Sequence, residues 1–171
     1  HHPRTHRIRE ILDAGVIGAV RRVTGAFTFR MDPLDPRNIR LRPDLAGGSL
    51  LDVGCYPVSA IRWAMGAEPV HIFARARHAH GVDVEVSGQL SFPDDRAASF
   101  DCGFTLPYRA GLEVVGTQGT IRVPRMWAPH PRARWEVEVN GQAAVEHAVE
   151  GGDQVVGMLD EFAAAVWEGR D

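Results

Sequence analysis

The chain has 171 residues, a formal charge of −3 and 44% hydrophobic residues. A chain of this length makes one ordinary domain and buries roughly two-thirds of its unfolded surface. No basic stripe stands apart from acidic neighbours, which argues against nucleic acid as the main partner. No run of about 18 apolar residues occurs, so we expect no membrane span. The first ten residues lack the apolar stretch of a secretory signal.

The basic residues of the chain are all arginine, and no lysine is present. A Schiff-base lysine or a lysine clamp on phosphate is therefore excluded within this sequence. The two cysteines, Cys55 and Cys102, are too few for a disulfide framework or a zinc site. We expect a reduced, cytoplasmic protein without a metal site.

The first third of the chain predicts a helix, a strand and a long loop. Residues 4–14 carry apolar side chains at helical spacing, with Pro3 before them and Gly15 after them. Residues 23–31 alternate between apolar and polar types, as a half-buried strand does. Residues 32–48 contain three prolines and two glycines, and irregular loops of this length are often functional.

A second helix is expected over residues 49–65, closed by Gly66. Ser49 and Asp52 stand three apart, which is the spacing of a capping box. Pro57 lies inside the segment, so the helix is expected to kink or restart there.

Residues 69–149 are β in character, and a third helix is expected over 153–168. Short turns join the strands, so the sheet should be mainly antiparallel. The expected fold is α+β: one domain over 1–171, with an open sheet and the three helices packed on one face. The expected strands lie at 70–78, 82–92, 98–106, 112–116, 119–123, 135–139 and 143–149.

The segment 47–57, GGSLLDVGCYP, is the strongest candidate for a site. Asp52 and Tyr56 are four apart, so on a regular helix both would project from one face. A carboxylate beside a phenol can orient a hydroxyl and take part in proton transfer. The alternative is that Asp52 only completes the cap of Ser49 and Tyr56 only packs.

Other polar groupings favour structural roles. His78 and His80 would share one face of a strand, but no matching carboxylate or cysteine accompanies them, which favours an edge-strand surface. Residues 116–119 fit a hairpin turn better than a phosphate cradle. His1, His2 and His6 are either native or the remnant of an affinity tag. No G-x-G-x-x-G motif follows a strand, so the chain has no dinucleotide fold of its own.

Three segments together resemble the second domain of the Gfo/Idh/MocA oxidoreductases. They are HHPRTHRIREILDAGVIG, NIRLRPDLAGGSLLDVGCYPVSAIRWAMGAEP and VVGTQGTIRV. Within this family the chain is most similar to the branch of dimeric dihydrodiol dehydrogenases, xylose dehydrogenases and glucose–fructose oxidoreductase. Tyr56 stands where many other relatives have histidine, which points to this branch.

The resemblance implies the substrate-binding half of an NAD(P)-dependent enzyme that acts on a sugar or diol. An N-terminal Rossmann domain, absent from this chain, would bind NAD or NADP and supply a Glu-Lys-Pro motif. A further C-terminal segment is also absent, so the piece alone is expected to be inactive. The alternative is a non-catalytic ligand-binding or scaffolding relative.

The resemblance also implies roles for particular residues. Tyr56 would be the acid/base or hydroxyl-orienting group beside the lysine of the other domain, because a tyrosine ordinarily titrates at about pH 10 and needs a nearby cation to act as a base. Asp52 would bind a substrate hydroxyl or orient the catalytic groups. Arg37, Asn38 and Arg40 would contact sugar hydroxyls. His2 and Pro3 would lie beside the nicotinamide.

The resemblance finally implies a homodimer formed sheet against sheet. Helices on one face leave the other face of the sheet uncovered, and a large apolar face in that position would favour a partner.

Overall fold

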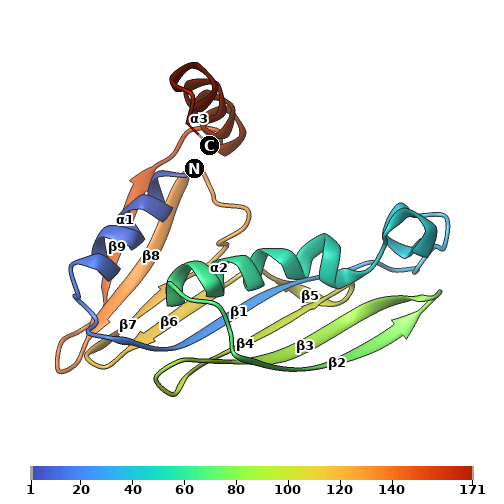
Figure 1. The fold of residues 1–171 in the computed structure, drawn as a ribbon, viewed down its shortest axis with the longest axis horizontal. Helices are drawn as coiled ribbons and strands as arrows, with labels where there is room; N and C mark the ends of the chain where they lie inside the picture. The colour runs from blue at the N-terminus through green and yellow to red at the C-terminus, as the bar shows by residue number, and fades with distance from the viewer. Residues whose placement is uncertain (1, 171) are drawn as a thin grey trace.

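The computed structural model describes residues 2–170 and has an open nine-stranded sheet with three α-helices (Figure 1). The strand order is β2-β3-β4-β1-β6-β7-β8-β9, and β5 pairs with β1 beside this path. The α+β class is confirmed. The helices are α1 (Pro3–Asp13), α2 (Cys55–Met65) and α3 (Gln154–Glu168). The strands are β1 (Val20–Arg30), β2 (His71–Ala79), β3 (Val82–Phe92), β4 (Arg96–Gly103), β5 (Thr105–Arg109), β6 (Leu112–Gly116), β7 (Gly119–Val123), β8 (Arg132–Val139) and β9 (Val145–Glu150).

The sheet is mainly antiparallel, as predicted, with one parallel pair between β1 and β4. Helix α2 and the β2–β3 hairpin lie between these two strands in sequence, so the chain has the length that a parallel connection needs. The predicted strand 98–106 is instead divided between β4 and β5. Strand β5 pairs with the C-terminal end of β1. The predicted strands 82–92, 112–116 and 119–123 are confirmed at both ends.

Helices α1 and α2 pack on the same face of the sheet, and that face carries the core. Ile8 of α1 and Ile61 of α2 are fully buried. Strand residues on this face follow the period of two, as in Val82, Val84 and Val86 of β3. None of the helices in the described part of the chain is long and apolar enough to cross a membrane.

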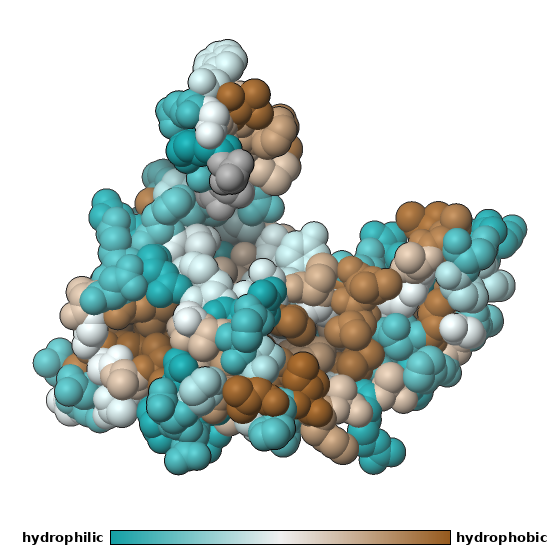
Figure 2. Space-filling model, in the orientation of Figure 1, coloured by the Kyte–Doolittle hydropathy of each residue, from teal (hydrophilic) through white to brown (hydrophobic). Residues whose placement is uncertain are grey.

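The third helix differs from the expectation, because α3 does not cover the sheet. It stands off beyond the end of β9 (Figure 1), and none of its residues is buried. Its predicted apolar stripe is present but exposed, with Phe162 at 68% and Val166 at 61% (Figure 2).

The uncovered face of the sheet is polar, which corrects the expectation of a large apolar surface. Thr24 lies opposite Glu113, which lies opposite Arg122. The Arg122 guanidinium pairs with Glu113 at 3.1 Å and with Glu138 at 2.8 Å. The hydrophobic argument for sheet-to-sheet pairing therefore fails.

Candidate functional site

The segment that leads into α2 is held by a carboxylate from β3. Asp83 Oδ2 accepts hydrogen bonds from Ser49 Oγ at 2.8 Å and from Leu50 N at 2.7 Å. Gly48 has φ +127°, and a Cβ on it would overlap the Asp83 carboxylate. The close approach therefore requires glycine at position 48.

The predicted capping box is wrong, because Asp83 takes the place of Asp52. Residues Leu50–Gly54 form a π-helical turn, and Ser49 makes no side-chain cap bond to it. The Asp52 carboxylate instead accepts a hydrogen bond from Arg40 Nε at 2.8 Å. π-Turns are rare and frequently mark functional sites.

Tyr56 follows this turn in the first turn of α2, and 48% of its surface is exposed. Its ring lies 5.4 Å from the Phe27 ring and 6.2 Å from the Trp127 ring, measured between centroids. Asp52 and Tyr56 thus have different partners: Asp52 pairs with an arginine, and Tyr56 contacts two aromatic rings. We call Phe27, Tyr56 and Trp127 the aromatic cluster.

Pro57 is accommodated by a restart of the helix, as predicted. The α-helical part begins at Cys55, which puts Pro57 in its first turn, where a missing N–H is tolerated. The buried proline packs on Gly25 of β1, where an added Cβ would lie 2.8 Å from Pro57 Cβ. This contact sets the distance between α2 and the sheet, and therefore the height of Tyr56 above Phe27.

Two of the three loop residues proposed for substrate contact have side-chain partners within the loop. Arg37 forms an ion pair with Asp35 at 2.7 Å, and its side chain is 89% exposed. The Asn38 side chain accepts a hydrogen bond from Arg40 N and caps the short 3-10 helix Ile39–Leu41. Arg40 is the member of the three that the structure connects to the candidate site, through Asp52.

Trp127 was not anticipated from the sequence. It lies in the irregular connection between β7 and β8, where no periodicity marks it. Its indole N–H donates to the carbonyl of Ala26 at 2.9 Å, and its ring lies 6.3 Å from that of Phe27. The only signal was a tryptophan in a segment rich in proline, which is a weak one.

His2 caps α1 rather than presenting a free imidazole. Its Nδ1 accepts a hydrogen bond from Arg4 N at 3.1 Å, and the side chain is 5% exposed. Burial, followed by the charge of Arg4, lowers the pKa of His2 from its usual value. Pro3 is exposed in the first turn of α1. His1 lies outside the described residues.

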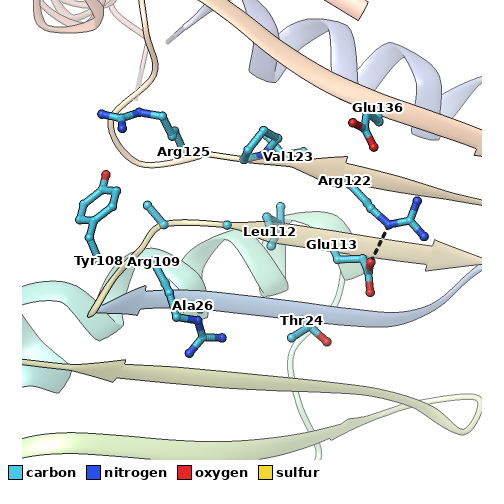
Figure 3. Close-up of a pocket in the computed structure, with 13 residues that line it drawn as sticks. Thr24, Ala26, Tyr108, Arg109, Leu112, Glu113, Arg122, Val123, Arg125 and Glu136 are labelled. Atoms are coloured by element: carbon cyan, nitrogen blue, oxygen red, sulfur yellow. Dashed lines mark hydrogen bonds and ion pairs between the residues drawn. The ribbon is translucent and has the colours of Figure 1, made fainter. Parts of the chain in front are cut away.

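A groove of about 650 Å³ lies between Tyr108, Arg125 and the polar face of the sheet (Figure 3). Thr24, Glu113 and Arg122 form its floor, where Arg122 pairs with Glu113. The residues proposed for substrate or catalysis do not line this groove. We assign it no role in the reaction.

The described residues contain no cluster of three metal ligands. His78 lies on edge strand β2, as expected, while His80 adopts φ +54° in the following turn and leaves the strand face. Residues 116–119 form the turn between β6 and β7, as predicted. No strand–glycine turn–helix unit occurs among the described elements, so these residues do not form a cradle for a dinucleotide.

The chain is similar to known oxidoreductases over almost its whole length. It is 34% identical over 173 residues to a D-xylose 1-dehydrogenase (NADP(+)) from Haloferax volcanii, and the match covers 99% of this chain and 52% of that protein. It is 34% identical over 142 residues to the trans-1,2-dihydrobenzene-1,2-diol dehydrogenase of Mus musculus, over 82% of this chain and 40% of that one. The chain thus spans about half the length of the curated relatives it matches.

Solved structures show the same fold. A 3-ketoreductase from Actinomadura kijaniata, in complex with NADP and TDP-benzene, superimposes with a TM-score of 0.88 at 29% identity, over 99% of this chain and 52% of that one. Other structures of that reductase carry a tyrosine changed to phenylalanine, or a lysine changed to alanine or glutamate. Residues 5–122 match the GFO/IDH/MocA C-terminal domain, and the chain belongs to that family.

Proposed function

We propose that this chain is the substrate-binding and subunit-pairing half of an NAD(P)-dependent oxidoreductase that acts on a sugar or diol hydroxyl by hydride transfer. The observation that carries the proposal is the placement of Tyr56. Its ring is fixed by Phe27 and Trp127, and about half of its surface is open to a ligand. The names of the relatives support a sugar or diol as the substrate class.

In this proposal Tyr56 exchanges the proton on the reacting substrate oxygen. The rings of Phe27 and Trp127 restrict water on one side of its phenol, and general acid–base catalysis of this kind contributes about 10²–10⁴-fold. Asp52 binds a substrate hydroxyl or orients the catalytic groups. Its Oδ2 accepts a hydrogen bond from Arg40 Nε, which orients the carboxylate.

The cofactor, NAD or NADP, is bound mainly by an N-terminal half of the full-length protein, since the described residues form no dinucleotide cradle. That half also supplies the lysine that the present chain lacks. In this proposal His2 and Pro3 lie beside the nicotinamide, and the N-terminal half covers the exposed stripe of α3. The piece alone is inactive, because catalysis requires both halves to hold the reactants together. The location is cytoplasmic, in keeping with two free cysteines.

The test is Tyr56→Phe in the full-length protein, assayed with NAD and NADP against a panel of aldoses and trans-diols. We expect kcat to fall by about 10²-fold or more, with an unchanged melting temperature, since one oxygen is removed and little packing. The matched control is Tyr108→Phe, because Tyr108 is also 48% exposed. It should keep kcat within threefold.

If Tyr56→Phe keeps kcat within threefold, Tyr56 is a packing residue and the catalytic assignment fails. If the intact full-length protein turns over none of the panel yet binds an aldose or a diol, the non-catalytic alternative is favoured.

A further inference from the structure

Arg4 is a buried cation that pairs with no carboxylate among the described residues. Its side chain lies in the first turn of α1, and the residue is 2% exposed. Burial lowers the pKa of its guanidinium to about 10, so the group remains charged at neutral pH. A buried charge is costly unless its donors are satisfied. Both terminal nitrogens of Arg4 have acceptors, whereas its buried Nε has none among the described residues.

The oxygen acceptors of Arg4 are main-chain carbonyls, three of which follow one another along the chain. Its Nη1 donates to Pro124 O at 3.2 Å, and its Nη2 donates to Arg125 O at 3.2 Å and Met126 O at 3.1 Å. A longer bond of 3.5 Å reaches Arg134 O. Three successive carbonyls can converge on one planar group only if the chain turns sharply around it.

The chain does turn sharply at this point. Arg125 adopts φ +51°, a left-handed conformation that non-glycine residues rarely take. Such a conformation persists where the surroundings hold it. The guanidinium supplies part of that restraint, because it bonds to the carbonyls on both sides of Arg125 as well as to its own. A hydrogen bond from Met126 N to Ala110 O also holds the turn.

The residue immediately after this turn is Trp127, one member of the aromatic cluster. Its indole is fixed at one end by the hydrogen bond to Ala26, and its ring rests against Phe27 and Tyr56. The position of the Trp127 ring therefore depends on the conformation of the turn at residues 124–126.

We propose that Arg4 is a positioning residue for the candidate active site: by binding the carbonyls of residues 124–126 it holds Trp127 against Tyr56. The guanidinium does not touch the substrate or the reacting atoms. It acts through the turn and the indole, and it links the N-terminal end of α1 to the wall of the site. The effect of Arg4 on catalysis rests on the proposed function of Tyr56. Its effect on the position of Trp127 does not.

The test compares Arg4→Met, Arg4→Lys and Arg7→Met in the full-length protein. Arg7 lies one turn further along α1, its side chain is 63% exposed, and it forms an exposed ion pair with Glu10, so Arg7→Met is the matched control. Assays are made at least 20 °C below the lowest melting temperature. We expect Arg4→Met to lower kcat/KM tenfold or more, Arg4→Lys to retain part of it, and Arg7→Met to stay within twofold.

A second readout is independent of turnover. The emission of Trp127 is isolated by subtracting the spectrum of the same protein carrying Trp127→Phe. In Arg4→Met this emission should shift to the red and become more accessible to acrylamide. If the proposed activity is absent but the emission shifts, the structural coupling holds and the proposed function fails.

Two results would overturn the proposal. One is an Arg4→Met protein with unchanged Trp127 emission and kcat/KM within threefold. The other result concerns Arg4→Lys, which carries the test if Arg4→Met does not fold. Wild-type Trp127 emission and wild-type kcat/KM in Arg4→Lys would show that the guanidinium fork does not position the indole.

Discussion

The two cysteines of the chain occupy contrasting environments. Cys55 is exposed at the start of α2, directly before Tyr56, whereas Cys102 is fully buried on β4. Burial raises the pKa of the Cys102 thiol to about 11, and the hydrogen bond with Ser49 offsets only part of that effect. Because the thiolate is the reactive form, Cys102 should be inert in the folded protein.

Labelling of the isolated chain with a maleimide at pH 8 should modify one thiol, and Cys55→Ser should abolish the reaction. The folded state keeps Cys102 protonated while the unfolded thiol ionises near its ordinary pKa of 9. The contribution of this residue to stability is therefore present below about pH 9 and is lost as the pH rises towards 11. Rapid labelling of Cys102 at pH 8 in the folded chain would contradict the burial.

Single residues also show what could and could not be predicted. The sequence and its family resemblance singled out Tyr56 beside a glycine pair, but neither its exposure nor its two ring neighbours was predicted. Asp83 could not be predicted as the group that holds the start of the helical segment, because it lies 34 positions from Ser49. Sequence spacing favoured Asp52 for that role, and a long-range contact replaced it.

At the scale of elements, the packing of α2 on β1 depends on one glycine. A Cβ at Gly25 would lie 2.8 Å from the Pro57 side chain, which is closer than carbon atoms pack. Helix α2 would have to rise from the sheet, and overpacking of this kind costs about 1–3 kcal/mol.

We therefore expect Gly25→Ala to lower the free energy of unfolding by about 1–3 kcal/mol in urea titrations. The matched control is Gly111→Ala, where the nearest atom to an added Cβ is 3.8 Å away. The control should change the free energy of unfolding by less than about 0.5 kcal/mol. Equal effects of the two substitutions would show that the α2–β1 distance is not set at Gly25.

Element boundaries were predicted best where alternation is strict. Strand β3 alternates buried and exposed residues over nearly its whole length, and its ends were predicted correctly. The division between β4 and β5 was missed, because Phe104 continues the apolar pattern across the break and is itself fully buried. That α3 does not pack on the sheet was missed for another reason. An apolar stripe predicts that the face of a helix is covered, but it does not show which part of a protein covers it.

At the scale of the whole molecule, we propose that two copies pair through the uncovered sheet face. The structure shows that this face is polar, so the interface would rest on shape and on paired charges rather than on apolar burial. Thr24 is exposed on the central strand of the face, with Ser99 Oγ 3.4 Å from its hydroxyl.

Light scattering of the full-length protein at micromolar concentration should give twice the mass of one chain. Thr24→Arg places a bulky charge at the centre of the proposed interface and should shift the mass to that of a monomer. Ser59→Arg, on the exposed side of α2, should leave it unchanged. A monomeric mass for the unsubstituted protein at all concentrations would end the proposal.

Strand β1, at the centre of the sheet, has a consequence for how the chain is made. Arg22 pairs with Ala97 across 75 positions, and Thr24 pairs with Glu113 across 89. During synthesis β1 therefore emerges long before either neighbour, and contacts of such separation form slowly. A nascent or truncated chain that stops before β6 leaves one edge of a half-apolar strand open to other molecules. The chain is therefore most prone to aggregation during synthesis, before the strands that pair with β1 have emerged.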